Sequence, residues 1–474
     1  MRKELVELRD RIRAGKETLE DSQKQRFIAL LEDQDPKVRR LAMQIIGAMK
    51  WDDLLENMFL TYQKEETLFV RPDYLLAMGQ LTYDKFLPEL KNCLQEISEM
   101  DVQEDVKVHL EKERKILKEL IVAKEGIKRH SFAGLQKETE ILLTTRKGLE
   151  DITKNQIQGM PKKLFPHGVM VKTADIDDLL QLRTYEELLF YMGEVPAEED
   201  SAKLKDLLAE KKIGEFIKEC HREKHPMGVR ISLESSMEME KRGAFIRHLW
   251  IGLMDCYQGE IYDATTGYEA EIRLVKTVKD TYRVFVKLFT LPRNPFDYRK
   301  ESIATSLKPY MAANLVQLGL EYMKEGAQIL DPFCGVGTLL VERRMALYTG
   351  DTYGVDTFME AIEKARKNCE KVGPNIHFIQ RDFADFTHAY KFDEIITDMP
   401  RGSKMVTREE LKRDYELLFT KGEELLNEKG RMFVYGNEHG FMKQQLRRHK
   451  NFKLLKDRII SEKLDTHFYV IEYM

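Results

Sequence analysis

Apolar and polar positions in the last third of the chain form short apolar runs separated by longer amphipathic stretches. Each short run predicts a strand and each amphipathic stretch a helix. This alternation indicates a parallel sheet with helices on both faces, with strands at residues 327–330, 352–355, 376–380, 394–397 and 432–435. The runs 452–456 and 467–473 have no helix between them, so we expect them to pair antiparallel at one edge.

The middle of the chain, residues 129–295, mixes both patterns and predicts an α+β region. We expect strands at 139–145, 168–172 and 228–232, helices after 146–150 and at 176–182 and 242–257, and a hairpin of 268–276 with 281–290. Basic side chains gather near its first loops: Arg146, Lys147, Lys162, Lys163 and His167. Such a cluster is either a solvated face or a contact for an RNA backbone.

Residues 1–128 are expected to be all-helical, because apolar residues recur at steps of three and four, as in Phe27, Leu30 and Leu31. Asp35 suits an N-cap and Pro36 a first helical position. The segment DPKVRRLA (35–42) resembles HEAT-type helical repeats, and a plain helical bundle fits about as well. This region is either a surface for a protein partner or RNA, or a stabilising cap. The charged run 102–128 predicts one long helix that leads out of it.

The composition limits the class of protein. The 474 residues carry 77 basic and 81 acidic side chains, a net charge of −4, which excludes a uniformly basic nucleic-acid coat. Five cysteines without a CxxC pair argue against a disulfide framework or a zinc knuckle, so we expect no metal site and a reducing compartment. No apolar run is long enough for a membrane span, and the charged start lacks a signal peptide, so we expect a cytoplasmic protein.

Glycines and acids follow the first two predicted strands of the last third. The first strand ends in DPFCGVGT, where Gly335 and Gly337 allow a tight turn and a close approach of a ligand to the backbone. The second ends at Asp356, which lies 25 residues after Asp331, close to the spacing at which an acid meets a ribose in dinucleotide folds. The turn lacks a P-loop lysine, so the ligand need not be a triphosphate.

The third predicted strand leads to Asp382 and Phe383, an acid that can accept from an adenine amino group and a ring that can flank the base. Any one of these acids alone is better explained as a helix cap or a solvated turn. Three acids at three successive strand ends favour a nucleoside-type cofactor at this edge of the sheet.

The fourth predicted strand ends in Asp398-Met399-Pro400-Arg401. Pro400 fixes the turn, so the Asp398 carboxylate and a nearby main-chain carbonyl are expected to point into one cavity. Two acceptors suit an exocyclic amine, whose lone pair is then aimed at an electrophilic methyl group. An ordinary strand-to-loop turn is the alternative.

These motifs carry a resemblance to a family. The last third resembles class I S-adenosylmethionine-dependent methyltransferases, with a Rossmann-like seven-stranded sheet. DPFCGVGT (331–338), TDMPRG (397–402) and FDYRKESIATSLKPYMAANLV (296–316) are similar to the THUMP-associated RNA guanine-N2 methyltransferases. LLTTRKGLEDI (142–152) resembles the opening of their ferredoxin-like part. The resemblance covers about residues 139–474 and implies a ferredoxin-like, degenerate THUMP region that binds RNA (129–295) and a methyltransferase domain (296–474). The helical domain (1–128) is not part of the usual family plan.

The resemblance also assigns roles to residues. It implies that the cofactor contacts Asp331, Phe333, Gly335, Gly337 and Thr338, together with Ser306 from the upstream segment 296–316. Asp356 would contact the ribose of the cofactor, and Asp382 and Phe383 its adenine. The catalytic residues would be Asp398, Met399, Pro400 and Arg401, although the family has an aromatic residue where Arg401 stands.

The implied activity is methyl transfer to guanine N2 in tRNA, with rRNA possible. Adenine-N6 or protein-amide methylation is the alternative within enzymes. An RNA-binding scaffold that keeps a cofactor pocket is the alternative outside them.

Overall fold

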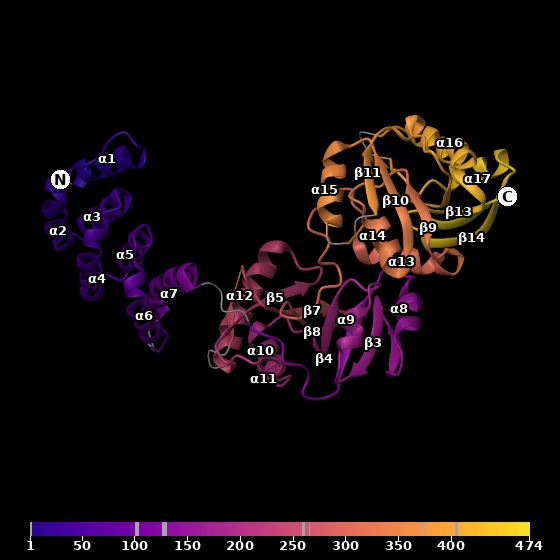
Figure 1. Cartoon of the computed structure of the whole chain (residues 1–474). Helices are drawn as coiled ribbons and strands as arrows, with labels where there is room; N and C mark the ends of the chain where they lie inside the picture. The colour runs from indigo at the N-terminus through magenta and orange to yellow at the C-terminus, as the bar shows by residue number, and fades with distance from the viewer. Residues whose placement is uncertain are drawn as a thin grey trace. The chain divides into compact units, whose positions relative to one another are not determined.

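The computed structural model describes residues 2–99, 104–125, 130–257, 261–264, 266–370, 372–373, 375–402 and 406–474. The chain divides into two compact units, Met1–Arg129 and His130–Met474 (Figure 1). Among the described residues, no helix is long and apolar enough to cross a membrane.

The N-terminal unit is helical, as predicted. Its elements are α1 (Arg2–Arg13), η1 (Asp21–Gln23), α2 (Lys24–Leu31), α3 (Pro36–Met49), η2 (Asp52–Leu54), α4 (Leu55–Lys64), α5 (Arg71–Met78), η3 (Asp84–Phe86), α6 (Leu87–Glu99) and α7 (Glu104–Glu125). The Asp35 side chain accepts from the Lys37 N–H and caps α3, with Pro36 at its first position. Of the predicted long helix, residues 102–103 and 126–128 lie outside the described residues.

Helical hairpins stack through their second helices in this unit. Helices α2 and α3, α4 and α5, and α6 and α7 pair, while α3 contacts α5 and α5 contacts α7. The carboxylate of Glu113 on α7 is buried and accepts from the Tyr62 hydroxyl (2.6 Å) and from Arg71 Nε (2.9 Å). This arrangement is that of a helical repeat array; its assignment to the HEAT type stays a prediction.

A mixed sheet forms the first part of the C-terminal unit. Its elements are β1 (Thr139–Thr144), α8 (Glu150–Gln156), β2 (Lys162–Phe165), β3 (Gly168–Thr173), α9 (Asp177–Gln181), β4 (Leu188–Pro196), α10 (Ser201–Ala209), α11 (Ile213–Glu219), β5 (Met227–Glu234), α12 (Met239–Cys256), β6 (Ile261–Asp263), β7 (Ala270–Lys276) and β8 (Thr281–Leu288). The described strands run in the order β2-β3-β1-β4-β8-β7-β5-β6.

The first half of this sheet confirms the expected ferredoxin-like part, because β1-α8-β2-β3-α9-β4 has the split βαβ order with β1 between β3 and β4. The sequence did not predict β2, β4, β6, α10 or α11. Strand β2 lies at an edge with little burial, and β6 has three residues, so neither carries a strong alternation.

The second sheet follows the predicted strands closely. Its elements are α13 (Pro309–Gly319), η4 (Leu320–Tyr322), β9 (Ala327–Asp331), α14 (Thr338–Ala346), β10 (Thr349–Asp356), α15 (Met359–Cys369), β11 (Ile376–Gln380), η5 (Phe383–Asp385), β12 (Phe392–Asp398), α16 (Arg408–Leu425), β13 (Leu426–Gly436), α17 (His439–Arg448), β14 (Phe452–Ser461) and β15 (Thr466–Tyr473). The described strands have the order β11-β10-β9-β12-β13-β15-β14. As predicted, β14 and β15 pair antiparallel at one edge.

Successive side chains of this sheet enter two different cores. Ile329, Ile396 and Phe433 pack with α13, α14 and α15, whereas their neighbours Leu330 and Ile395 face the core that holds α16 and α17. Figure 1 shows these helices around the orange and yellow strands. The sheet is therefore covered on both faces, as expected for a doubly wound α/β domain.

Two neighbouring residues of α14 make buried ion pairs in different directions. Arg343 pairs with Glu394 on β12 through Nε–Oε2 (2.8 Å) and Nη2–Oε1 (2.9 Å), and both side chains are at most 2% exposed. Glu342 pairs with Arg183 of the first sheet region (2.8 Å) and accepts from the Tyr298 hydroxyl (2.7 Å). Helix α14 is thus tied both to the sheet beneath it and to the preceding domain.

We expect Glu394→Gln to lower the free energy of unfolding of the C-terminal unit by about 3–5 kcal/mol, because it leaves the Arg343 guanidinium buried without a counter-charge. Calorimetry would record a lower transition temperature. Glu360→Gln is the matched control, since Glu360 pairs with Lys364 on an exposed helix face and its loss should cost below about 0.5 kcal/mol. Equal shifts for the two variants would contradict the role of the buried pair.

Candidate active site

Three acids lie together at the carboxyl ends of β9, β10 and β12. Asp331 is 1% exposed, and burial raises the pKa of its carboxyl to about 8, with a smaller contribution from the negative charges of Asp398 and Asp356. The predicted acids of these three strands therefore share one region, and burial, with a smaller effect of the neighbouring charges, favours the protonated form of Asp331. A carboxyl with a shifted pKa marks a candidate functional site.

Asp382, the fourth predicted acid, follows β11. Its side chain caps η5 by accepting from the Ala384 N–H, which lowers the pKa of the carboxyl, and it pairs with Arg413 of α16 at 3.1 Å. Asp382 is therefore ionised and partly exposed at the rim.

The glycine turn between β9 and α14 leaves room for a ligand. Gly335 and Gly337 have φ angles of +52° and +78°, which side-chain-bearing residues adopt rarely. The Gly335 N–H donates to Asp356 Oδ2 (2.9 Å), and a Cβ added at Gly335 would meet no atom within 4 Å. A Cβ at Gly337 would come within 2.7 Å of the Phe378 ring. Gly337 thus serves packing, whereas Gly335 borders open space beside Asp356.

A buried asparagine joins the upstream segment to this turn. Asn368 Oδ1 accepts from the N–H groups of Lys300 (3.0 Å) and Glu301 (2.9 Å), and Nδ2 donates to the carbonyls of Glu301 and Val336. Asn368 was not among the residues predicted from the sequence. The available signal was a polar residue within the apolar stripe of α15, three positions after Ala365.

The predicted residues Ser306 and Thr338 lie in the same contact region. Arg299 donates to the Thr338 hydroxyl and to the carbonyls of Glu301 and Leu307. The Ser306 hydroxyl accepts from the Ile303 N–H at 2.9 Å. Both hydroxyls therefore help to shape the upstream segment over α14.

Phe333 and Phe383, the two aromatic residues predicted to contact the cofactor, differ in how exposed their rings are. Phe333 is half-buried, and its ring centroid lies 5.9 Å from that of Phe383. The Phe383 ring is 2% exposed and packs against Phe386, so it lies in the core rather than open beside an adenine. The residue after the acid is apolar because it fills the core beneath η5.

The Asp398 turn holds an ion pair. Asp398 Oδ1 lies 3.1 Å from Arg401 Nη2, and the guanidinium lies 5.1 Å from the centre of the Tyr435 ring. Burial raises the pKa of Asp398 to about 6, and Arg401 opposes that rise. The expected amine acceptor is therefore already in contact with a cation.

Met399 and Pro400 shape this turn. The Met399 N–H donates to the Tyr435 carbonyl (2.8 Å), and its side chain is 1% exposed in the core. Met399 was predicted among the catalytic residues, but its side chain faces away from solvent, so only its backbone borders the site. Pro400 is half-buried between Met399 and Arg401.

The chain was compared with known proteins. Residues 297–463 match the model of the UPF0020 family, described as the RMKL-like methyltransferase domain. A tRNA (guanine(10)-N2)-dimethyltransferase from Methanothermobacter thermautotrophicus is 35% identical over 98 residues, which is 20% of this chain and 28% of that protein. The match thus spans less than a third of this curated relative.

Solved structures extend the likeness of fold beyond the methyltransferase domain. TrmN from Thermus thermophilus matches with a TM-score of 0.54 at 20% identity, over 71% of this chain and 100% of that one. SMU.472, solved in complex with SAH, matches with a TM-score of 0.54 at 18% identity, over 71% of this chain and 98% of that one. Together with the doubly wound sheet and the glycine turn, these matches identify residues 297–463 as a class I S-adenosylmethionine-dependent methyltransferase domain of the RMKL-like type.

Proposed function

We propose that this chain methylates an exocyclic amine of RNA, and that the target is guanine N2 in tRNA, with rRNA as a possible substrate. The observation that carries the proposal is the half-buried Asp398 carboxylate at the end of β12, beside the acids at the ends of β9 and β10. The relative that acts on guanine 10 of tRNA supports the choice of base. A tRNA substrate would also place the enzyme in the cytoplasm.

The residues at the glycine turn fit S-adenosylmethionine. The cofactor carries a sulfonium and an ammonium, and the turn offers the buried Asp331, the Asp356 carboxylate and open space beside Gly335. Asp356 would accept from the ribose hydroxyls, and Asp382 from the adenine amine. SMU.472, which shares this fold, was solved in complex with SAH, and this supports a cofactor of that kind.

When bound, the cofactor supplies an electrophilic methyl group; the protein supplies orientation and electrostatics. Asp398 accepts hydrogen bonds from the target amine and aims its lone pair along the line of transfer. The carboxylate then stabilises the positive charge that develops on the nitrogen. No base is needed before attack, because the proton leaves the nitrogen after the new bond forms.

Arg401 would change partners during binding of the base. Its guanidinium lies over the Tyr435 ring, 5.1 Å from the ring centre, and the target base would lie against the guanidinium plane once the contact with Asp398 opens. A base in structured RNA must leave its stack to reach this depth.

Adenine-N6 and protein-amide methylation would use the same Asp-x-Pro turn. A solved structure from Listeria monocytogenes, described as a predicted N6-adenine-specific DNA methylase, shares the fold over 70% of this chain, so the choice of guanine in RNA is supported by the curated relative and not by the fold. The match to TrmN covers more of the chain than the methyltransferase domain alone, which supports a shared arrangement of both parts. The Asp398–Arg401 contact is the observation that most favours the alternative of a non-catalytic scaffold, because it occupies the predicted amine acceptor.

We expect the purified chain to bind S-adenosylmethionine in calorimetry and Asp356→Ala to weaken that binding by at least about tenfold, because two hydrogen bonds to the ribose and the contact with Gly335 are lost. Asp351→Ala is a control on the same strand, since Asp351 is exposed and pairs with His377. Absence of binding by the native chain would refute the methyltransferase proposal.

Incubation with labelled cofactor and unmodified total tRNA or rRNA should label the RNA, and nucleoside analysis should find N2-methylguanosine. Asp398→Ala should reduce the rate by about 100-fold or more while it leaves cofactor binding intact. Label in protein or DNA would overturn the RNA assignment, and N6-methyladenosine would overturn the choice of guanine.

The rate of transfer should fall as the pH drops through about 6, because protonated Asp398 no longer accepts from the amine. Removal of a neighbouring cation raises the pKa of an acid, so Arg401→Gln should move this inflection to higher pH. A pH–rate profile that is unchanged in the Arg401→Gln variant would show that the two side chains are not coupled.

A further inference from the structure

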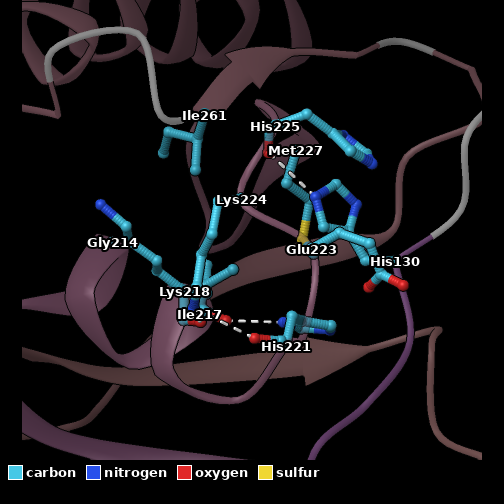
Figure 2. A pocket seen from close by; sticks show the side chains of 10 residues that line it. All are labelled: His130, Gly214, Ile217, Lys218, His221, Glu223, Lys224, His225, Met227 and Ile261. Atoms are coloured by element: carbon cyan, nitrogen blue, oxygen red, sulfur yellow. Dashed lines mark hydrogen bonds between the residues drawn. The ribbon is translucent and has the colours of Figure 1, made fainter.

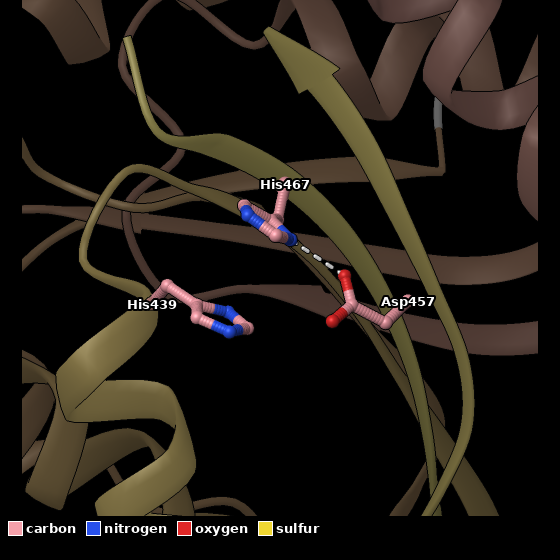
Figure 3. Close-up of side chains that lie close together, drawn as sticks. All are labelled: His439, Asp457 and His467. Carbon is pink, nitrogen blue, oxygen red and sulfur yellow. Dashed lines mark hydrogen bonds and ion pairs between the residues drawn. The ribbon is translucent and has the colours of Figure 1, made fainter. Parts of the chain in front are cut away.

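Two histidines and an aspartate that are not among the acids described above lie together on α17, β14 and β15. His439 begins α17, Asp457 lies in β14 and His467 lies in β15 (Figure 3). One candidate ligand atom from each lies within 4.8 Å of the other two. The sequence predicted no metal site because these residues are far apart in the chain and no cysteine accompanies them.

In this cluster one nitrogen of His439 and both nitrogens of His467 face a polar group. His439 Nδ1 lies 2.6 Å from the Tyr469 hydroxyl. His467 Nδ1 lies 2.6 Å from Asp457 Oδ1, and its Nε2 lies 3.6 Å from a carboxylate oxygen of Asp465. This is the usual support of metal-binding histidines, in which the second ring nitrogen contacts a carboxylate or another oxygen.

We propose that His439, Asp457 and His467 bind a divalent transition-metal ion such as Zn²⁺. His439 Nε2, His467 Nδ1 and one oxygen of Asp457 are the ligands, while Tyr469 and Asp465 orient the two rings from outside. Imidazole nitrogen and carboxylate oxygen suit zinc, whereas magnesium and calcium prefer oxygen alone. His467 is 8% exposed at the side chain and Asp457 30%, so the site is reached from solvent on one side.

Binding requires a small rearrangement and a change of tautomer. The His439 and His467 rings are stacked, with centroids 4.2 Å apart and 16° between their planes, so one ring must turn to aim its nitrogen at a shared ion. The proton that now lies between His467 Nδ1 and Asp457 must leave Nδ1 before the metal–nitrogen bond forms, and the neutral ring then carries its one N–H on Nε2, which faces Asp465.

A second histidine cluster shows by contrast why this one is a candidate. A cavity of about 20 Å³ in the first sheet region is lined by His130, Gly214, Ile217, Lys218, His221, Glu223, Lys224, His225, Met227 and Ile261 (Figure 2). There, His130 contacts Glu269 and the His225 carbonyl, and His221 contacts the Ile217 carbonyl and Thr290. Both nitrogens of these two buried rings are therefore hydrogen-bonded, whereas among the described residues His439 Nε2 has no hydrogen-bond partner and His467 Nε2 meets Asp465 only at 3.6 Å.

A metal ion at the proposed site would join three elements. His467 pairs with Gly436 at the end of β13 and with Ile459 in β14, and His439 starts the next helix after β13. The Arg401 guanidinium lies over the ring of Tyr435, the residue before Gly436. The ion would therefore fix the edge of the sheet that borders the Asp398 turn.

The test uses the full chain without a polyhistidine tag, stripped with a chelator and desalted. Titration with Zn²⁺ in a calorimeter should show one ion per chain, Mg²⁺ should give no binding, and Co²⁺ should produce visible absorption bands of nitrogen and oxygen ligation. Zn²⁺ should also raise the melting temperature, and chelator should reverse the rise.

His439→Ala and Asp457→Asn should weaken or abolish the uptake, whereas His377→Ala, which removes the exposed partner of Asp351, should leave it unchanged. Circular dichroism and S-adenosylmethionine binding check that each variant is folded; Asp457→Asn keeps the size of the side chain and serves if His439→Ala fails this check. The proposal would be overturned if the native chain took up no Zn²⁺, or if the His439 and Asp457 variants took up as much Zn²⁺ as the native chain.

Discussion

Adjacent, oppositely charged side chains on α14 set the geometry on which the candidate active site depends. Arg343 pairs downward with Glu394 of β12, the strand that ends in Asp398, and Glu342 pairs outward with Arg183 of the first sheet region. The N-terminus of the same helix follows the glycine turn. One rigid element therefore relates the cofactor side, the acceptor side and the neighbouring domain. Buried pairs of this kind add little net stability, but they penalise every alternative position of the helix.

The second sheet was largely predictable because its strands are short apolar runs bounded by helical periods, and buried parallel strands of this kind leave a clear pattern. The acids at the strand ends followed from the topology. The contacts of Asn368 and the Arg183–Glu342 pair were not predictable, since each joins segments distant in sequence; the polar residue in the apolar stripe of α15 marks Asn368 but not its partners. Phe383 was assigned to the ligand and lies in the core, because a residue next to a functional acid can equally fill the space below it.

The first sheet region shows the opposite case. Its edge strand β2 and the three-residue β6 have weak alternation, so no pattern predicted them. In the ferredoxin-like half, strands β1 and β3 followed from the pattern, and the link to a ferredoxin-like part came from the resemblance in LLTTRKGLEDI. Edge position alone does not explain the misses, because the central strand β4 was missed and the edge strand β14 was predicted.

The contact between Asp398 and Arg401 sets a threshold for entry. While the Arg401 guanidinium pairs with the Asp398 carboxylate, displacement of the guanidinium by a water molecule or a lone amine is unfavourable in free energy. The carboxylate would exchange a charged partner for a neutral one. A planar base offers its amine to Asp398 and its face to the displaced guanidinium at the same time. The site would then select planar bases over other amines, because a ligand must contact both Asp398 and Arg401 in order to separate them.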